Sequence, residues 1–134
     1  MIQPLLIFSD WAIFVARVVL GLILVRHGLP KLKNPKGTGV WLEGVGFRPG
    51  IFWGLVAGLL EFVGGLALVF GFLTQLASFF IVLQFLVILF KFKNKAMFEK
   101  DAEIDWLILT LALLILTLGS GALSVDEFFG LILY

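Results

Sequence analysis

Two ionisable side chains of opposite sign, Arg17 and Glu61, each lie in the middle of a long apolar stretch of this 134-residue chain. A charge at that depth of an apolar helix is costly, so it normally faces the protein interior, has a partner and marks a functional position. A guanidinium and a carboxylate can form a bidentate hydrogen-bonded pair. Arg17 and Glu61 are therefore expected to pair and to form the centre of a buried polar site.

Four apolar segments must position these charges, and they run roughly over residues 9–29, 51–70, 73–91 and 104–120. At about 1.5 Å per residue, the longer segments reach about 30 Å, the thickness of a bilayer's hydrocarbon core. Hydrophobic residues make up 61% of the chain and charged residues 14%, whereas soluble domains are about 45–50% apolar and about 25% charged. The sequence predicts an all-α, integral membrane four-helix bundle that forms one domain over residues 1–134 and lies in the cell membrane as a multi-pass protein.

Basic residues cluster in two of the connecting segments. Lys31, Lys33, Lys36 and Arg48 lie between the first and second spans, and Lys91, Lys93, Lys95 and Lys100 lie between the third and fourth. By the positive-inside rule these two loops are cytoplasmic, so both termini are expected on the outer side. Basic loops can also bind nucleic acid or anionic lipid, but topogenic charge is the simpler account. The expected surroundings are membrane lipids, and no nucleic-acid partner is expected.

The first loop is long enough to contain an element of its own. Asn34, Pro35, Gly37 and Gly39 are turn residues, and Pro49 stands just before the second span. Residues 40–47 between them are amphipathic and too short to cross a membrane. They predict a short helix or a re-entrant segment at the cytoplasmic interface.

Small residues mark the faces on which both charges lie. At 100° per residue, Arg17 shares a stripe with Leu20, Gly21, Leu24, Gly28 and Lys31, and Glu61 shares one with Gly54, Gly58, Gly65 and Leu68, with Gly64 beside it. Small residues let membrane helices approach closely, so the glycines of both stripes are expected to pack helix against helix. Arg17 and Glu61 lie about eight and nine residues from the outer ends of their spans, which predicts that they meet at one level.

Further polar residues could extend the site towards the cytoplasmic side. His27 flanks the stripe of Arg17, and Glu103 and Thr110 share a stripe of the fourth span with Thr117 and Gly121. Gln75 and Gln84 point to opposite faces of the third span, and Gln84 is the deeper of the two. With one histidine and no cysteine in the chain, no metal site is expected, and His27 is read as an interfacial polar residue.

Three motifs resemble the signatures of the DoxX family. The segment from Arg17 to Lys31, with His27-Gly28 near its end, is similar to the family's opening pattern, and Glu61-Phe-Val-Gly64-Gly65 followed by Gly71-Phe-Leu-Thr74 is similar to its second-helix pattern. Gly119-Ser-Gly121-Ala-Leu-Ser124-Val-Asp126 resembles its closing pattern. The matches occur in order and cover nearly the whole chain.

This resemblance implies a four-helix membrane protein related to subunits of thiosulfate:quinone oxidoreductase. Carried over by position, it implies roles for Arg17, His27, Lys31, Glu61 and Asp126, but it brings no catalytic mechanism. Because the chain has no thiol, a redox role would require a partner subunit or a bound quinone to handle electrons. The chain would then be a non-catalytic subunit of an oxidoreductase.

Three functions stay open on this basis. The first is a membrane component of a quinone-linked redox system, in which Arg17 and Glu61 supply a hydrogen-bond donor and a proton acceptor, His27, Lys31 and Glu103 lie towards the cytoplasm and Thr110 lines the path. The second is a small-solute or lipid-handling protein, which at this size would require a homo-oligomer to form a pathway. The third is a scaffold or assembly partner, in which the Arg17–Glu61 pair has a purely structural role.

Overall fold

The computed structural model describes residues 4–93 and 102–131, and every regular element within these two ranges is a helix. In chain order the elements are η1 (Pro4–Phe8), α1 (Ser9–Lys33), α2 (Pro35–Gly44), α3 (Gly50–Phe70), α4 (Thr74–Val87), the π-helical η2 (Ile88–Lys93), α5 (Glu103–Leu118) and α6 (Val125–Phe129). The predicted all-helical class is confirmed for this described part. Of the basic residues expected in the third loop, Lys95 and Lys100 lie outside it.

Three helical stretches are long and apolar enough to cross a membrane, namely Pro4–Lys33, Gly50–Phe70 and Thr74–Lys91. They correspond to the first three predicted spans. At 16 residues, α5 is shorter than the about 20 residues that a membrane-spanning helix needs. The fourth crossing therefore stays a prediction.

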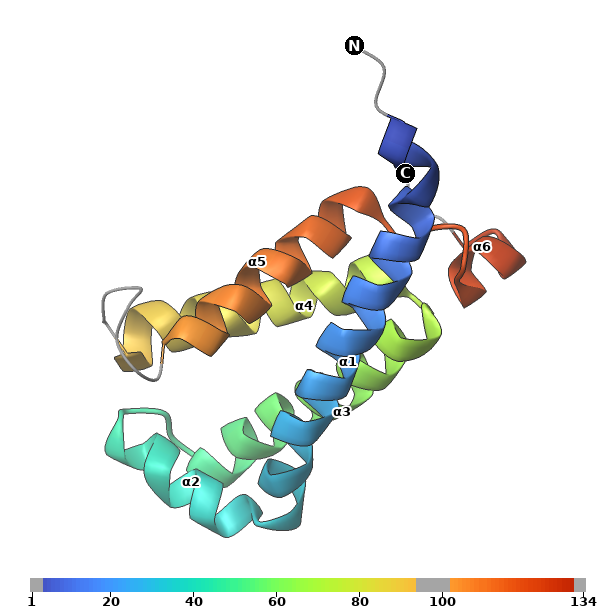
Figure 1. Cartoon of the computed structure of the whole chain (residues 1–134). Helices are drawn as coiled ribbons and strands as arrows, with labels where there is room; N and C mark the ends of the chain where they lie inside the picture. Colours follow the sequence, from blue (N-terminus) through green and yellow to red (C-terminus); the bar gives the residue numbers. More distant parts are fainter. Residues whose placement is uncertain (1–3, 94–101, 132–134) are drawn as a thin grey trace.

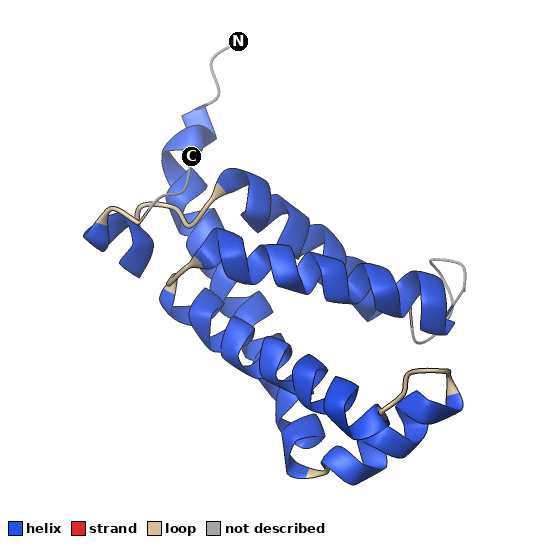
Figure 2. Ribbon diagram, turned by 180° about the vertical axis from the view of Figure 1, so that it is seen from behind, coloured by secondary structure: helices blue, strands red, loops and turns tan. Residues whose placement is uncertain are grey.

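The helices form two packed pairs that meet at the turn between α3 and α4. Helix α1 runs along α3, the short α2 packs on the beginning of α3, and α4 packs against α5 (Figure 1). Seen from behind, the ribbons of the α2–α3 unit and the α4–α5 pair lie close at that turn and diverge towards the other end (Figure 2). This arrangement gives the molecule two different ends.

The apolar core lies where α1, α3, α4 and α5 meet. Its fully buried members include Leu20 and Leu24 of α1, Leu68 of α3, Phe85 of α4 and Ala112 of α5. Many other large apolar side chains remain exposed along the same helices. A soluble protein rarely leaves so much apolar surface uncovered, whereas acyl chains are a suitable environment for it.

Two glycine contacts set the register between α1 and α3. A β-carbon added to Gly21 would lie 2.5 Å from the carbonyl oxygen of Gly65, and one added to Gly28 would lie 2.8 Å from that of Gly58. The two contacts are separated by seven residues on each helix, which is about two helical turns. The predicted glycine faces are therefore confirmed as packing faces, and they fix which residues of the two helices lie at the same level.

The predicted short helix after the first span is confirmed as α2, although it begins at Pro35, ahead of the amphipathic stretch. Pro35 occupies the first turn, where its missing N–H costs nothing, and the side chain of Asn34 accepts a hydrogen bond from Gly37 N at 3.1 Å. Gly39 and Leu42 are buried against α3. The helix is thus docked on the bundle.

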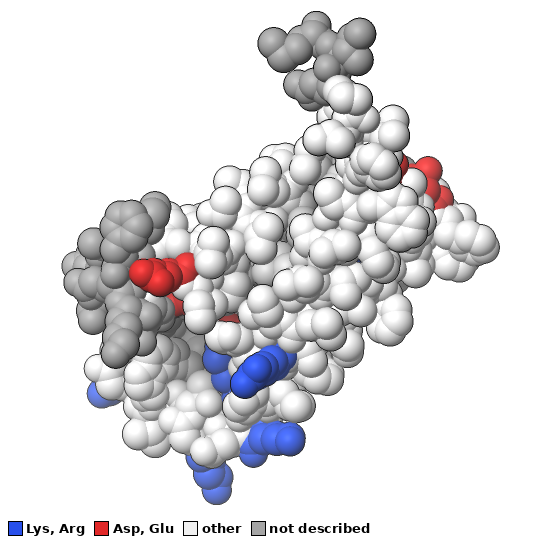
Figure 3. Space-filling view, in the orientation of Figure 1, with Lys and Arg blue, Asp and Glu red and all other residues white. Residues whose placement is uncertain are grey.

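The two ends of the bundle differ in charge. Lysine and arginine side chains gather at the end where α1 leads into α2 (Figure 3). At the opposite end the beginning of α1 lies beside the segment before α6, because Ala122 N donates to Asp10 Oδ1 at 3.1 Å. This separation is the charge pattern on which the predicted orientation rests.

Candidate functional site

The two charges singled out in the sequence are both buried as predicted. The side chains of Arg17 and Glu61 are each 1% exposed, Arg17 on α1 and Glu61 on α3. The other residues that share their predicted stripes are buried with them, except Lys31, whose side chain is 29% exposed. The orientation of both stripes towards protein is therefore confirmed.

The predicted pairing of Arg17 with Glu61 is wrong. Arg17 bonds to backbone carbonyls near the C-terminus, whereas Glu61 pairs with Lys31. Arg17 lies level with Gly71, which is ten residues beyond Glu61 on α3 and hence about 15 Å away along the helix axis. The structure therefore contains two separate polar clusters where the sequence predicted one.

The physical reason is the register set by the glycines. The prediction aligned the outer ends of the two spans, but η1 and the start of α1 extend past the end of α3. Placing Gly21 against Gly65 and Gly28 against Gly58 shifts Arg17 to the level of Gly71. The matching seven-residue spacing of these two pairs was the sequence signal that could have given the right alignment.

The first cluster surrounds Arg17 and is closed by the C-terminal motif. Arg17 Nη1 donates to the carbonyl oxygen of Ser120 at 2.8 Å, and Nη2 donates to that of Leu123 at 2.7 Å. The guanidinium fills the space beside Gly71, whose φ of +71° is also one that side chains rarely adopt. A glycine is therefore needed there both for the turn and for the close approach of Arg17.

Asp126 completes this cluster by holding the α3–α4 turn. Its two carboxylate oxygens accept hydrogen bonds from the backbone of Leu73 at 2.6 Å and of Thr74 at 2.8 Å. These are unpaired N–H groups at the start of α4, where the helix dipole also favours a negative charge. Ser124 caps α6, accepting from Glu127 N at 3.1 Å, so the C-terminal motif has a structural role in this fold.

A small cavity of about 10 Å³ lies beside Asp126, with Thr74 and Ser120 in its lining. That is room for about one water molecule and too little for an organic ligand. The Arg17 cluster therefore joins α1, the α3–α4 turn and the C-terminal segment.

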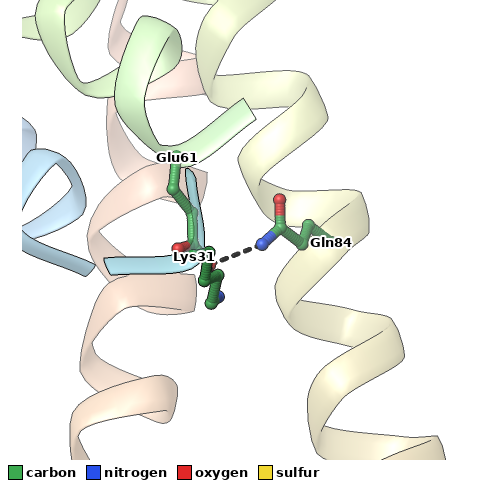
Figure 4. Close-up of polar contacts among 3 residues, drawn as sticks. All are labelled: Lys31, Glu61 and Gln84. Carbon is green, nitrogen blue, oxygen red and sulfur yellow. Dashed lines mark hydrogen bonds and ion pairs between the residues drawn. The ribbon is translucent and has the colours of Figure 1, made fainter. Parts of the chain in front are cut away.

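The second cluster joins Lys31, Glu61 and Gln84 from three helices. Lys31 Nζ and Gln84 Nε2 both donate to Glu61 Oε1, each at 2.6 Å. Figure 4 shows Gln84 reaching from α4 with its amide nitrogen towards Glu61 and its amide oxygen turned away. Gln84 thus faces inward, and Gln75 also faces protein, because its Nε2 donates to the carbonyl of Leu116 in α5 at 3.3 Å.

Glycines position this cluster as well. A β-carbon on Gly58 would lie 3.1 Å from Cβ of Lys31, and one on Gly28 would lie 2.9 Å from Cβ of Glu61. The two backbones can approach only because neither position carries a side chain. Lys31, near the end of α1, lies beside Gly58 of α3. Its side chain reaches Glu61, which is about one turn after Gly58 in the same helix.

Two buried acceptors of this cluster have no donor among the described residues: Glu61 Oε2 and Gln84 Oε1. Leaving a buried polar atom unpaired costs about 1–3 kcal/mol, so such atoms are rare without a reason. The Lys31 side chain is 29% exposed, which connects the cluster to the basic end of the molecule. A buried carboxylate with one free oxygen beside a partly accessible ammonium can bind a small polar headgroup.

The chain that follows Gln84 is irregular and makes aromatic contacts. The π-helical η2 begins four residues after Gln84, and such segments often occur at functional sites. Lys91 Nζ lies 5.0 Å from the centre of the Phe47 ring, which connects η2 with the α2–α3 loop. Phe90 of η2 and Trp106 of α5 make an edge-to-face contact, with ring centroids 6.3 Å apart.

Three residues predicted to extend the site are not brought to either cluster. His27, Glu103 and Thr110 are exposed on their helices. Thr110, which was expected to line the path, is exposed, and its hydroxyl donates to the carbonyl of Trp106 in its own helix at 2.8 Å. A threonine satisfied in this way can face lipid. The buried carboxylate at this end of α5 is Asp105, which was not among the predicted site residues.

The sequence comparisons now assign the chain to a family. The DoxX profile matches residues 12–94, more than half of the chain, so the protein belongs to the DoxX family. It is 36% identical over 126 residues to "Inner membrane protein YqjF" of Escherichia coli (strain K12), covering 89% of this chain and 92% of that protein. It is 30% identical over 112 residues to "Putative oxidoreductase CatD" of Bacillus subtilis (strain 168), covering 84% and 82%. No solved structure gives a significant match.

The family and the helices agree on where the protein resides. DoxX membership, a relative named as an inner membrane protein and three helices of membrane-crossing length define a multi-pass membrane protein. The Lys31–Glu61–Gln84 cluster therefore lies among membrane helices, towards their basic end.

Proposed function

We propose that this protein is a membrane component of a quinone-linked oxidoreductase system, and that the Lys31–Glu61–Gln84 cluster binds the quinone headgroup. The observation that carries the proposal is the buried carboxylate with one unpaired oxygen beside a partly exposed lysine. The relative whose name contains "oxidoreductase" supports the redox class. This proposal moves the polar site from the expected Arg17–Glu61 pair to a different set of residues.

The residues of the cluster suit a quinone headgroup. Lys31 can donate to a headgroup oxygen, Glu61 can accept a proton or a hydrogen bond, and Gln84 holds the other carboxylate oxygen in place. Ligand sites are typically apolar with a few converging polar groups, and exposed apolar surface on the surrounding helices can accommodate an isoprenoid tail. A bound quinone supplies two-electron chemistry that this thiol-free chain lacks.

Electrons would reach or leave such a quinone through another protein. The chain contains no cysteine, and the described residues contain no group of three His, Asp or Glu side chains that could hold a metal ion. A redox partner subunit is therefore part of the proposal, with this chain acting as its membrane-embedded, non-catalytic quinone-binding component.

The proposed bundle has four crossings, with α5 as the fourth and both termini on the outer side. The lack of cysteine makes this simple to test, because every introduced cysteine is unique. Glu127→Cys and Lys36→Cys place a thiol on exposed positions at opposite ends of the bundle. A membrane-impermeant maleimide applied to intact cells should label the first and not the second, and labelling of Lys36→Cys alone would reverse the orientation.

Quinone binding is tested with the purified protein in lipid nanodiscs. Decylubiquinone or its reduced form should bind saturably, and Glu61→Ala should abolish binding. Glu103→Ala, which removes an exposed carboxylate from the same end, serves as the matched control and should bind like the wild type. If the folded wild type binds neither form, the proposal fails and the assembly-partner function becomes the better account.

A further inference from the structure

The polar atoms that lack partners in the Lys31–Glu61–Gln84 cluster are all of one kind. Among the described residues, Glu61 Oε2 and Gln84 Oε1 are buried without a hydrogen bond, and both are acceptors. The orientation of the Gln84 amide is fixed by chemistry, because the carboxylate of Glu61 can only accept and so requires the amide nitrogen. A ligand completing this cluster therefore has to bring hydrogen-bond donors.

Both donors of the cluster act on the same carboxylate oxygen. Lys31 Nζ and Gln84 Nε2 each lie 2.6 Å from Glu61 Oε1, which leaves Oε2 as the free acceptor. The Lys31 ammonium has three N–H donors and uses one on Glu61, and its side chain is partly exposed. The cluster thus offers one buried acceptor and, next to it, a spare donor.

This pattern matches a hydroxyl group. A hydroxyl can donate to Glu61 Oε2 while its own oxygen accepts from Lys31. Resting on the proposed function, we infer that the cluster selects the reduced, hydroxyl-bearing form of the quinone over the oxidised, carbonyl-bearing form. Glu61 is then the residue that discriminates between the two forms, and Gln84 is a positioning residue that holds the carboxylate.

The oxidised form satisfies only half of the pattern. Its carbonyl oxygen can accept from Lys31, but it has no donor for Glu61 Oε2, which stays buried and unpaired. Sites built to bond a hydroxyl discriminate strongly against analogues that lack it, because the buried group is left without a partner. We expect the reduced form to bind at least about tenfold more tightly.

The preference for the reduced form also changes the reduction potential of the bound quinone. Stabilising the reduced form raises the reduction potential of the bound pair relative to the free pair. A tenfold ratio of dissociation constants corresponds to about 30 mV for a two-electron couple. The site would therefore draw reduced quinone from the membrane and favour its retention.

The first test uses the wild-type protein in nanodiscs and three ligands of nearly the same shape. These are decylubiquinol, decylubiquinone, and the dimethyl ether of decylubiquinol, which has the aromatic ring but no O–H donor. The inference expects decylubiquinol to bind at least about tenfold more tightly than the other two. Equal binding of all three, or tighter binding of the oxidised form, overturns the inference and leaves the proposed function standing. Binding of none defeats both.

The second test changes the acceptor itself. Glu61→Gln replaces the free carboxylate oxygen by an amide that can donate to a carbonyl, so the ratio of the two dissociation constants should fall to about one or invert. Glu103→Gln makes the same chemical change at an exposed site and should keep the wild-type ratio. A Glu61→Gln protein that keeps the tenfold preference, or that loses both forms equally, contradicts the inference. If this variant does not fold, the wild-type comparison with the dimethyl ether decides alone.

Discussion

Arg17 and Glu61, the two buried charges singled out in the sequence, lie in clusters of opposite character. Arg17 is fully enclosed, bonded to the backbone carbonyls of Ser120 and Leu123, and surrounded by segments that its presence holds together. Glu61 has one oxygen with two donors and another with none among the described residues, and its partner Lys31 is partly exposed. Both side chains are buried to the same extent, but their charges are opposite and their partners differ.

That difference shows what distinguishes a structural charge from a candidate binding site. Arg17 Nε has no acceptor among the described residues, but both terminal nitrogens donate to backbone carbonyls. The cavity of about 10 Å³ beside Asp126 leaves room for no ligand larger than a water molecule. A carboxylate with a free oxygen retains the capacity to bind. The position of a charge within an apolar helix is therefore a weaker indicator of function than the set of groups around it.

The largest effect is expected from removing the enclosed charge. Arg17→Met leaves the carbonyls of Ser120 and Leu123 without their charged donor. Each hydrogen bond to a charged group contributes about 1.5–3 kcal/mol, so the expected loss of unfolding free energy is about 3–5 kcal/mol. Arg26→Met removes an exposed arginine from the same helix and should cost less than about 1 kcal/mol. Unfolding by SDS in mixed micelles measures both. A loss equal to that of the control would mean that Arg17 does not hold the bundle together.

The next largest effect concerns the register that separates the two clusters. Gly21→Ala puts a β-carbon 2.5 Å from the backbone oxygen of Gly65, so the helices must move apart, at a cost of about 1–3 kcal/mol. Gly64→Ala is the matched control, because its β-carbon meets only Ile81 at an ordinary 3.5 Å. The control should be neutral or more stable through higher helix propensity. Equal destabilisation in the same micelle assay would argue against the Gly21–Gly65 contact.

A smaller effect is expected where the C-terminal segment holds the α3–α4 turn. Asp126→Asn keeps one acceptor but loses the second and the negative charge, so one of the N–H groups of Leu73 and Thr74 is left without its partner. The expected loss is about 1–2 kcal/mol. Glu127→Gln changes the exposed neighbouring carboxylate and should have almost no effect. Thermal unfolding in detergent distinguishes the two, and a neutral Asp126→Asn would remove the capping role from Asp126.

The smallest effect is the sharpest test of the comparison. In a double-mutant cycle, Lys31→Met and Glu61→Gln should show a coupling of about 1 kcal/mol, modest because Lys31 is partly exposed. Arg17→Met and Glu61→Gln should show almost none, because distant sites without shared partners are additive within about 0.5 kcal/mol. A strong Arg17–Glu61 coupling would restore the single buried pair that the sequence suggested.

The sequence alone determined which side of α1 and of α3 faces protein. The glycine stripes identified these buried faces and placed Arg17 and Glu61 inward. Length and composition identified the membrane-crossing helices, and three motifs indicated the family. These features are local, because the geometry of a single helix converts sequence spacing directly into a face.

Only the tertiary structure decided which inward-facing residues meet. Partner choice depends on how far one helix slides along another, and glycine contacts between α1 and α3 set that distance. It also depends on the segment after α5, which brings Ser120 and Leu123 to Arg17 over 103 and 106 residues of sequence and Asp126 to Thr74 over 52. The buried face of a helix follows from the spacing of residues within that helix. A contact between two helices also depends on how far one is shifted along the axis of the other, and neither helix encodes that shift by itself.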